Sequence, residues 1–402
     1  MITLAFNCGS SSLRCALVEI GDAAPFAETR LARARVERIG ERASLELEVV
    51  GRDRERANVS AADHAEAVDL VLHGLGHKVQ ADGLAIGHRV VHGGARFVEP
   101  VLIGSEVLAA IGDLAHRVPL HNAAALAAIE ATRTQLPDVP AVAVFDTAFH
   151  QRLDAAAAEY PLPLEIARPH GVRRIGFHGL AHRSMAESYA RLRRTRAGAT
   201  KIITLQLGNG ASAAAVSEGR STDVSMGFSP LEGLMMGTRS GDLDPAIVAH
   251  LAQRLDASAG DIVELLNTRA GLLGVSGRSA DVRELLAAEA AGDARSALAL
   301  EMFVLRIQKC VGAYLAALRG AEAIVFGGGI GEHSAEIRAR VCRAFEWCGL
   351  ALDADANAHA SGAARISRDG ATLEAWVVPV DEEILIARDT ARCLRAQRTV
   401  GT

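Results

Sequence analysis

The chain has 402 residues, of which 50% are hydrophobic and 23% are charged, and its formal net charge is −5. This length predicts about two domains, and the aromatic content of 4% with no long block of one charge sign argues against a nucleic-acid partner. Only three of the 43 basic residues are lysines and none follows a glycine, so the P-loop motif is absent.

The cysteines and the N-terminus indicate the compartment. Six cysteines without a C-x-x-C pair do not form a disulfide framework in so long a chain, and they are typical of buried thiols in a reducing environment. The N-terminal sequence enters an apolar run at once without a basic leader, and no stretch of 18 apolar residues follows. We therefore expect a cytoplasmic protein that does not act at a membrane.

Short apolar runs alternate with longer amphipathic patterns, which predicts an α/β fold. We expect a solvated β-meander at 28–60, and prolines clustered at 160–176 mark a candidate domain boundary, with a second near Pro379. The expected strands are 2–6, 86–91, 141–145, 202–207, 323–326 and 376–380. The expected helices are 105–116, 122–134, 244–256, 281–289, 294–319 and 334–346.

A weak internal repeat links the two halves of the chain. The sequences ITLAFNCGSSS at 2–12 and ITLQLGNGASA at 203–213 each lead from an apolar strand through a Gly/Ser/Asn turn into another apolar run. One copy alone is compatible with an ordinary hairpin turn, although such a turn also directs N–H groups and hydroxyls toward a phosphate. Two copies half a chain apart predict a duplicated fold.

Glycine-rich turns offer a further place for a nucleotide. The sequence GGGIGE at 327–332 follows an apolar strand and precedes a helical pattern, so a nucleotide could approach the backbone there. It does not match G-x-G-x-x-G. The nearest match, Gly208-x-Gly210-x-x-Ala213, has too few residues after it for a helix, so a Rossmann site is not predicted.

Two histidines in HGLAH, His178 and His182, have the i, i+4 spacing of metal ligands. Gly179 stands where zinc proteases have glutamate, so that motif is broken, and polar histidines at a helix N-terminus are the simpler interpretation.

Three charged residues lie where chemistry is favoured. Asp146 ends an apolar strand, which places it at a ligand-binding edge of an α/β sheet or at a helix cap. Arg89 interrupts an apolar strand before a Gly-Gly turn, so it is either an edge residue or part of an anion site. Arg239 lies in the long irregular stretch 221–245, where it could bind phosphate with two hydrogen bonds or be a buried structural arginine.

In combination, these motifs resemble the acetate kinase family from residue 2 to about residue 390. The resemblance is carried by NCGSSSLR (7–14), HRVVHGG (88–94), PLHN (119–122), FDTAFH (145–150), GFHG (176–179), LGNGAS (207–212), MGFSPLEGLMMGTRSGDLDP (226–245), GLLGVSG (271–277), FGGGIGE (326–332) and DEEILIARDT (381–390).

The resemblance implies a duplicated actin-like ATPase (ribonuclease H-like) fold with two lobes around a central cleft. One lobe would comprise 1–150 and 381–402, and the nucleotide-binding lobe would comprise 151–380. The implied reaction is reversible transfer of the ATP γ-phosphoryl group to acetate, with Mg²⁺ or Mn²⁺ as cofactor, in a homodimer. A propionate kinase and a catalytically weakened nucleotide-binding relative remain alternatives. A third is a chaperone-like nucleotide-dependent protein on the same superfamily fold, which would not require Arg89, His178 and Arg239 beside an apolar pocket.

The resemblance also assigns site residues by their positions in the motifs. The implied catalytic residues are Arg89, Asp146, His178 and Arg239, and the implied metal positions are Asn7 and Glu382. The implied small apolar substrate pocket, which Arg89 adjoins, contains Val91, Leu120, Phe177 and Pro230. The implied phosphate and nucleotide positions are Ser10, Ser12, Arg14, Gln206, Leu207, Gly208, Asn209, Gly210, Asp281, Val282, Arg283, Gly329, Ile330, Gly331, Glu332 and His333.

Three of these positions depart from the family pattern. Arg14 stands where the family usually has lysine, which keeps the charge. Gln206 replaces a histidine and can still donate to a phosphate oxygen without carrying charge. His333 replaces an asparagine near the expected nucleotide, so the nucleotide preference is open.

Overall fold

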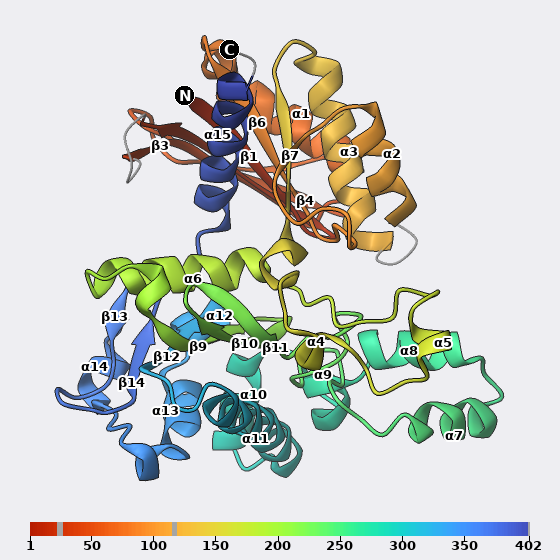
Figure 1. The fold of residues 1–402 in the computed structure, drawn as a ribbon, viewed down its shortest axis with the longest axis vertical. Helices are drawn as coiled ribbons and strands as arrows, with labels where there is room; N and C mark the ends of the chain where they lie inside the picture. The colour runs from red at the N-terminus through yellow and green to blue at the C-terminus, as the bar shows by residue number, and fades with distance from the viewer. Residues whose placement is uncertain (22–26, 115–118, 401–402) are drawn as a thin grey trace. The chain divides into compact units, whose positions relative to one another are not determined.

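The computed structural model describes residues 1–21, 27–114 and 119–400, apart from the side chains of 119–121 and 399–400. The chain divides into two compact units (Figure 1): unit 1 comprises Met1–Ala148 and Asp381–Thr402, and unit 2 comprises Phe149–Val380. The proline-rich stretch 160–176 lies inside unit 2, so the domain boundary expected there is wrong. Proline also ends or begins helices within a unit, as Pro163 does before the short helix α5 (Leu164–Ala167).

Unit 1 is built on a sheet that has, in the described residues, eight strands in the order β5-β4-β3-β2-β1-β6-β8-β7. Strands β1, β6 and β8 are parallel, and the remaining pairs are antiparallel. The strands are β1 (Ile2–Cys8), β2 (Ser12–Ile20), β3 (Glu28–Glu37), β4 (Ala43–Val49), β5 (Glu55–Val59), β6 (Leu84–Val90), β7 (Val101–Leu102) and β8 (Ala141–Phe145), of which β3 to β5 form the expected meander. The helices are α1 (His64–Leu75), α2 (Ser105–Leu114), α3 (Pro119–Gln135) and α15 (Glu382–Val400).

The alternation of side chains along the central strands assigns them to two faces. Phe6 of β1 packs into the core that α1 and α3 cover, and Nε2 of His88 in β6 lies 3.1 Å from Oγ1 of Thr132 in α3. The residues that follow, Asn7 and Arg89, therefore lie on the opposite face, which helix α15 covers. Consecutive residues thus serve a hydrophobic core on one face and a polar cluster on the other.

Unit 2 has a second sheet, ordered β11-β10-β9-β12-β14-β13. Its strands are β9 (Lys201–Leu207), β10 (Ala211–Ser217), β11 (Arg220–Val224), β12 (Ala323–Gly327), β13 (Ala364–Arg365) and β14 (Glu374–Val377). The helices are α4 (Ala155–Ala158), α5, α6 (Gly179–Leu192), α7 (Ala246–Leu255), α8 (Ala259–Thr268), α9 (Gly271–Ser276), α10 (Val282–Ala290), α11 (Ala294–Ala317), α12 (Gly328–His333), α13 (Ala335–Arg343) and α14 (Ala354–Ala358). Short 3₁₀ turns occupy Gly76–Gln80, Asp146–His150, Ala197–Ala199 and Glu346–Cys348.

The two sheets repeat one arrangement. The series β3-β2-β1-β6-β8-β7 matches β11-β10-β9-β12-β14-β13 in order and in the direction of every pair. The two copies of the sequence repeat form the equivalent hairpins β1–β2 and β9–β10. The duplicated α/β fold predicted from that repeat is therefore confirmed.

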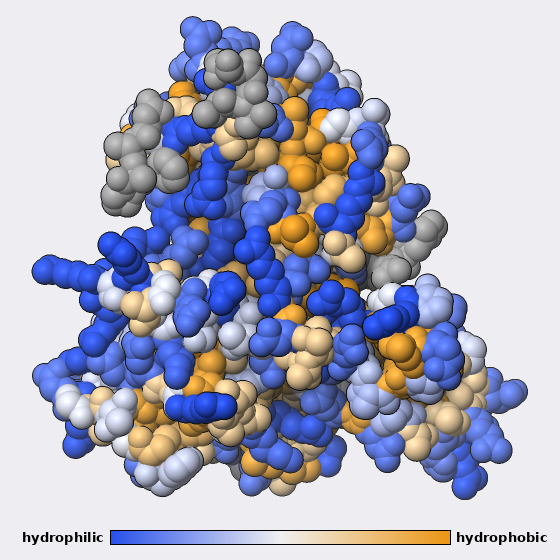
Figure 2. Space-filling model, viewed as in Figure 1, coloured by the Kyte–Doolittle hydropathy of each residue, from blue (hydrophilic) through white to orange (hydrophobic). Residues whose placement is uncertain are grey.

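The face of the molecule seen in Figure 2 is mainly polar. Figure 2 shows hydrophilic side chains over most of the visible face, with apolar side chains gathered around β7 and α3 of unit 1, where Leu102 of β7 is 39% exposed. Among the described helices, none has the length and apolar character needed to cross a membrane.

Candidate active site

The first cluster of candidate residues lies at the carboxyl ends of the parallel strands of unit 1, where α/β sheets bind ligands. Asn7 lies in β1, Arg89 lies in β6, and Asp146 directly follows β8. Arg89 donates from Nη2 to Asp146 Oδ2 at 2.8 Å and from Nη1 to Asn7 Oδ1 at 3.2 Å. Asp146 is fully buried, so this ion pair holds the Arg89 side chain in one orientation.

The start of helix α15 completes the cluster. Asn7 Nδ2 donates to Glu382 Oε2 at 2.5 Å and to Glu383 Oε1 at 3.2 Å. The structure thus brings together the four residues predicted for catalysis and metal binding in this unit, which are Asn7, Arg89, Asp146 and Glu382. Sequence reasoning missed Glu383, although the acidic run DEE at a helix start was a signal for it.

The cluster contains more negative than positive charge, since three carboxylates adjoin one guanidinium. Burial lowers the pKa of Arg89, but the charges of Asp146 and Glu382 outweigh this effect and raise it. Burial raises the pKa of Glu382, Asp146 and Glu383 raise it further, and Arg89 opposes them. Among the described residues, no three His, Cys, Asp or Glu side chains are arranged to hold a metal ion by themselves. In kinases, however, Mg²⁺ is held by only one or two carboxylates together with the substrate phosphates, and Glu382 could supply such a carboxylate.

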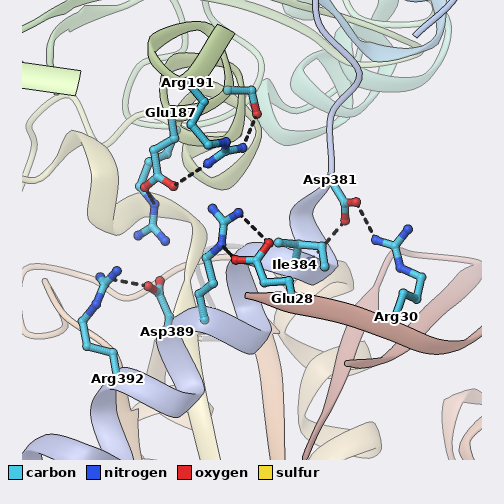
Figure 3. A network of polar contacts seen from close by, with 11 residues as sticks. Glu28, Arg30, Glu187, Arg191, Asp381, Ile384, Asp389 and Arg392 are labelled. Carbon is cyan, nitrogen blue, oxygen red and sulfur yellow. Dashed lines mark hydrogen bonds and ion pairs between the residues drawn. The ribbon is translucent and has the colours of Figure 1, made fainter. Parts of the chain in front are cut away.

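Salt bridges fix the end of α15 that bears these glutamates. Asp381 accepts a hydrogen bond from the backbone N–H of Ile384 at 3.1 Å, which caps the helix, and accepts another from Arg30 of β3 at 2.5 Å (Figure 3). Two turns further along α15, Arg388 pairs with Glu28, also of β3. These two contacts with one strand hold Glu382 and Glu383 against Asn7.

The other predicted residues of unit 1 lie near the same strand ends. Ser10 is exposed in the β1–β2 turn, Ser12 begins β2, and Arg14 is an exposed residue of β2 paired in register with Asn7. Val91, just after β6, is buried. The side chain of Leu120 lies outside the described residues.

The second cluster forms around His178 in unit 2. His178 adopts the left-handed conformation with φ 57° directly before helix α6, and its Nδ1 lies 2.9 Å from Ser212 Oγ. A Cβ on Gly210 would lie 3.3 Å from His178 Cε1 and 3.7 Å from Arg239 Nη1. The absence of a side chain at position 210 therefore allows His178 and Arg239 to approach the same point.

The side chain of Arg239 is held by contacts with a carbonyl and a sulfur atom rather than by an acidic partner in the described residues. Its Nη1 donates to Pro230 O at 3.2 Å and contacts Met236 Sδ at 3.7 Å, and within the described residues it forms no ion pair. Burial lowers the pKa of this guanidinium. A half-buried arginine with spare donors and no acidic partner is a site for an anion.

A network that the sequence did not predict holds the loop bearing Pro230. Arg174 Nη2 donates to Glu232 Oε1 at 2.8 Å, and its Nη1 donates to the carbonyls of three consecutive residues, 224–226. The Tyr160 hydroxyl donates to Glu232 and accepts from the Phe228 N–H at 2.8 Å. Burial lowers the pKa of Arg174, but the charge of Glu232 outweighs this effect and raises it, so the guanidinium stays charged.

The predicted nucleotide residues occupy two places in unit 2. Gln206, in register with Gly327, and Leu207 are the last two residues of β9, and Gly208, Asn209 and Gly210 form the turn to β10. Gly329, Ile330, Gly331 and Glu332 lie in α12, where Glu332 accepts from the N–H groups of Gly328 and Val380, both at 3.1 Å. His333 is exposed.

Residues 281–283 lie at the start of α10. Asp281 is its N-cap, and Val282 is buried. In the described part of the chain, the side chains of Asp281 and Arg283 pair with each other at 2.6 Å rather than with another predicted site residue.

Phe177 and His182 are both buried in unit 2. Each ring nitrogen of His182 lies within hydrogen-bond distance of a hydroxyl, Nδ1 near Thr204 and Nε2 near Ser212. The interpretation of His178 and His182 as polar histidines at a helix N-terminus therefore fits the structure better than metal ligation.

Comparison with known proteins identifies the family. A profile of the Acetokinase family matches residues 2–388. An acetate kinase of Solibacter usitatus is 44% identical over 98% of this chain and 98% of that protein. The crystal structure of Porphyromonas gingivalis acetate kinase is 38% identical with a TM-score of 0.86, over 98% of this chain and 99% of the other.

A crystal structure of a propionate kinase from Francisella tularensis is 34% identical, with a TM-score of 0.88, over 97% of this chain and 99% of the other. These matches cover nearly all of both chains, and they agree with the duplicated actin-like ATPase fold described above. The chain therefore belongs to the acetokinase family.

Proposed function

We propose that this protein transfers the γ-phosphoryl group of ATP to acetate, giving acetyl phosphate and ADP. The observation that carries the proposal is the pairing of Arg239, which has no acidic partner in the described residues, with His178 at the open position beside Gly210. Two donors that approach one point suit an anionic oxygen of a phosphoryl group. The relatives named acetate kinase support acetate as the acceptor.

The chemistry needs positioning and charge stabilisation rather than a strong base, because a carboxylate is already ionised at pH 7. Arg239 and His178 donate to the oxygens of the phosphoryl group as negative charge spreads over them. Arg89 binds a carboxylate or phosphoryl oxygen, and Asp146 orients Arg89 through their 2.8 Å ion pair.

Asn7 and Glu382 would hold Mg²⁺, which fits a cluster of hard oxygen donors whose carboxylates outnumber its cations. When bound, this ion neutralises charge on the ATP phosphates. The turn with Ser10, Ser12 and Arg14, and the equivalent turn at 206–210, offer N–H groups and polar side chains to phosphates. The residues 281–283 and 329–333 complete the proposed nucleotide site.

The proposed acceptor pocket contains Val91, Phe177 and Pro230. Val91 favours acetate over propionate, because a smaller side chain there would open the pocket, but one methylene is worth only about 1–3 kcal/mol. The similarity to a propionate kinase makes propionate the second candidate. Values of kcat/KM for acetate, propionate and butyrate distinguish them, and a preference for butyrate would contradict the proposal.

The activity is tested by hydroxamate formation from acetate, ATP, Mg²⁺ and hydroxylamine. We expect Arg239→Ala to lower kcat by on the order of 10³, as loss of an arginine that stabilises the transition state does. Arg254→Ala on the exposed face of α7 is the control and should retain full turnover. No product above the rate without enzyme would leave only a nucleotide-binding role, and normal turnover in Arg239→Ala would refute the assigned mechanism.

The proposed setting is a cytoplasmic homodimer. Helix α11 buries one face in unit 2 and leaves Leu298 and Leu305 39% and 50% exposed. Light scattering distinguishes a dimer from a monomer.

A further inference from the structure

A chain of hydrogen bonds leads from the interior of unit 2 to His178. The Oγ1 of Thr204 lies 2.7 Å from Nδ1 of His182, whose Nε2 lies 2.8 Å from Ser212 Oγ. The same Ser212 oxygen lies 2.9 Å from Nδ1 of His178. Thr204, His182 and Ser212 are completely buried, so these contacts are shielded from water.

The number of protons available to these four side chains limits the direction in which the hydrogen bonds between them can run. A neutral imidazole has one N–H donor and one acceptor nitrogen, and each hydroxyl donates one proton. The hydroxyl of Thr204 has a second acceptor, the carbonyl of Ala214, but at 3.5 Å this contact is at the outer limit of a hydrogen bond. The much shorter contact of 2.7 Å favours donation from Thr204 to Nδ1 of His182.

The remaining protons follow from that one. If Thr204 donates to Nδ1 of His182, the proton of His182 is on Nε2 and is donated to Ser212. Ser212 then donates to Nδ1 of His178, and the proton of His178 is on Nε2. In the opposite direction, His178 would present a lone pair at Nε2.

The identity of the donor at His178 Nε2 matters because of where this atom lies. A Cβ on Gly210 would be 3.5 Å from His178 Nε2 and 3.7 Å from Arg239 Nη1. An N–H there adds a second donor beside the guanidinium, whereas a lone pair there would repel a phosphoryl oxygen. We propose that Thr204, His182 and Ser212 are positioning residues that hold neutral His178 with its proton on Nε2. In this form His178 can donate a hydrogen bond to the transferred phosphoryl group, a role that rests on the proposed kinase function.

The duplicated fold provides an internal comparison. The two copies of the repeat align Thr3 of β1 with Thr204 of β9. In unit 1 the hydroxyl of Thr3 is buried and has no hydrogen-bond partner among the described residues. The equivalent threonine therefore has a histidine partner only in the unit that contains His178.

The test combines NMR with kinetics on two matched variants. Thr204→Val removes the hydroxyl and keeps the shape, and Thr204→Ser keeps the hydroxyl. In protein with ¹⁵N-labelled histidine, long-range ¹H–¹⁵N spectra report which nitrogen of each of the 14 histidines bears the proton, and His178→Asn assigns the relevant signal. We expect an Nε2–H signal for His178 in the unaltered protein and in Thr204→Ser, and a mixture of the two neutral forms in Thr204→Val.

In the kinetic experiment, Thr204→Val should lower kcat about two- to tenfold, the value of one hydrogen bond, with KM for acetate unchanged. Thr204→Ser should restore kcat. An Nδ1–H signal in the unaltered protein, or identical signals and kcat in the two variants, would overturn the proposal. If the valine variant does not fold, Ser212→Ala removes the hydroxyl between His182 and His178, and the same NMR and kcat measurements test the proposal. The NMR result needs no turnover, so failure of this proposal is distinguishable from failure of the kinase assay.

Discussion

Replacement of Arg89 by methionine provides a direct test of the charge balance in unit 1. Arg89 is the guanidinium that adjoins Asp146 and Glu382, and its side chain is 12% exposed while that of Asp146 is 0% exposed. Arg89→Met keeps an unbranched apolar side chain similar to the aliphatic part of arginine, removes the guanidinium, and leaves these carboxylates without their cation. Removing one partner of a buried pair costs about 3–5 kcal/mol, because the remaining charge is not compensated.

The expected effect is large enough to measure by thermal unfolding. At about 2–4 °C per kcal/mol for a domain of 150–250 residues, the loss corresponds to a decrease in Tm of roughly 6–20 °C at pH 7. Arg14→Met, on the adjacent strand β2, is the matched control, since Arg14 is exposed and forms no ion pair in the described residues. We expect its Tm to change little, because exposed charges contribute little to stability.

The pH dependence separates a charge effect from a packing effect. Burial and neighbouring carboxylates already raise the pKa of Glu382, and Arg89 opposes them. Without Arg89 the pKa of Glu382 rises further, so the folded variant binds this proton more tightly than the unfolded chain does. The difference in stability between the variant and the unaltered protein is therefore greatest at high pH and becomes smaller as the pH falls toward 5. A difference in Tm that stays constant between pH 8 and pH 5 would refute the reasoning.

Three further outcomes are expected. Burial lowers the pKa of His88 from 6.5 to about 3, so as the pH falls the unfolded chain binds this proton before the folded protein does, and stability decreases between pH 6.5 and pH 3. His88→Phe removes this group and should flatten that part of a plot of Tm against pH. A plot that is the same for both proteins would contradict the reasoning. Glu232→Gln removes the charge that pairs with Arg174 in the network that holds the loop bearing Pro230, so it should lower kcat as well as reduce Tm by a few degrees. A change in Tm without a change in kcat would show that the network does not position this loop for catalysis. Arg30→Ala removes the hydrogen bond from Arg30 to Asp381 at the start of α15. It should weaken Mn²⁺ binding to the enzyme–ADP complex, measured by EPR, about three- to tenfold. Arg35→Ala on the same strand should not weaken it.

Local patterns explain how much of the fold was predictable. The apolar runs and the repeat at 2–12 and 203–213 identified the central strands and the duplication, because a buried strand and its turn are encoded by adjacent residues. The helices expected at 244–256 and 294–319 occur as Ala246–Leu255 and Ala294–Ala317. The boundary expected at 160–176 is wrong, because prolines also separate short helices within one unit.

The sequence by itself also identified candidate residues one by one, such as Arg89, Asp146 and His178, since a polar residue at the end of an apolar strand or before a helix is visible locally. It did not identify their partners. The pairing of Asn7 with Glu383 joins residues 376 positions apart, and the direction of the proton on His178 depends on the distances of Thr204 from His182 and from Ala214. Tertiary structure decided these features, because pairings between distant segments and the geometry of single hydrogen bonds arise only when strands and helices pack.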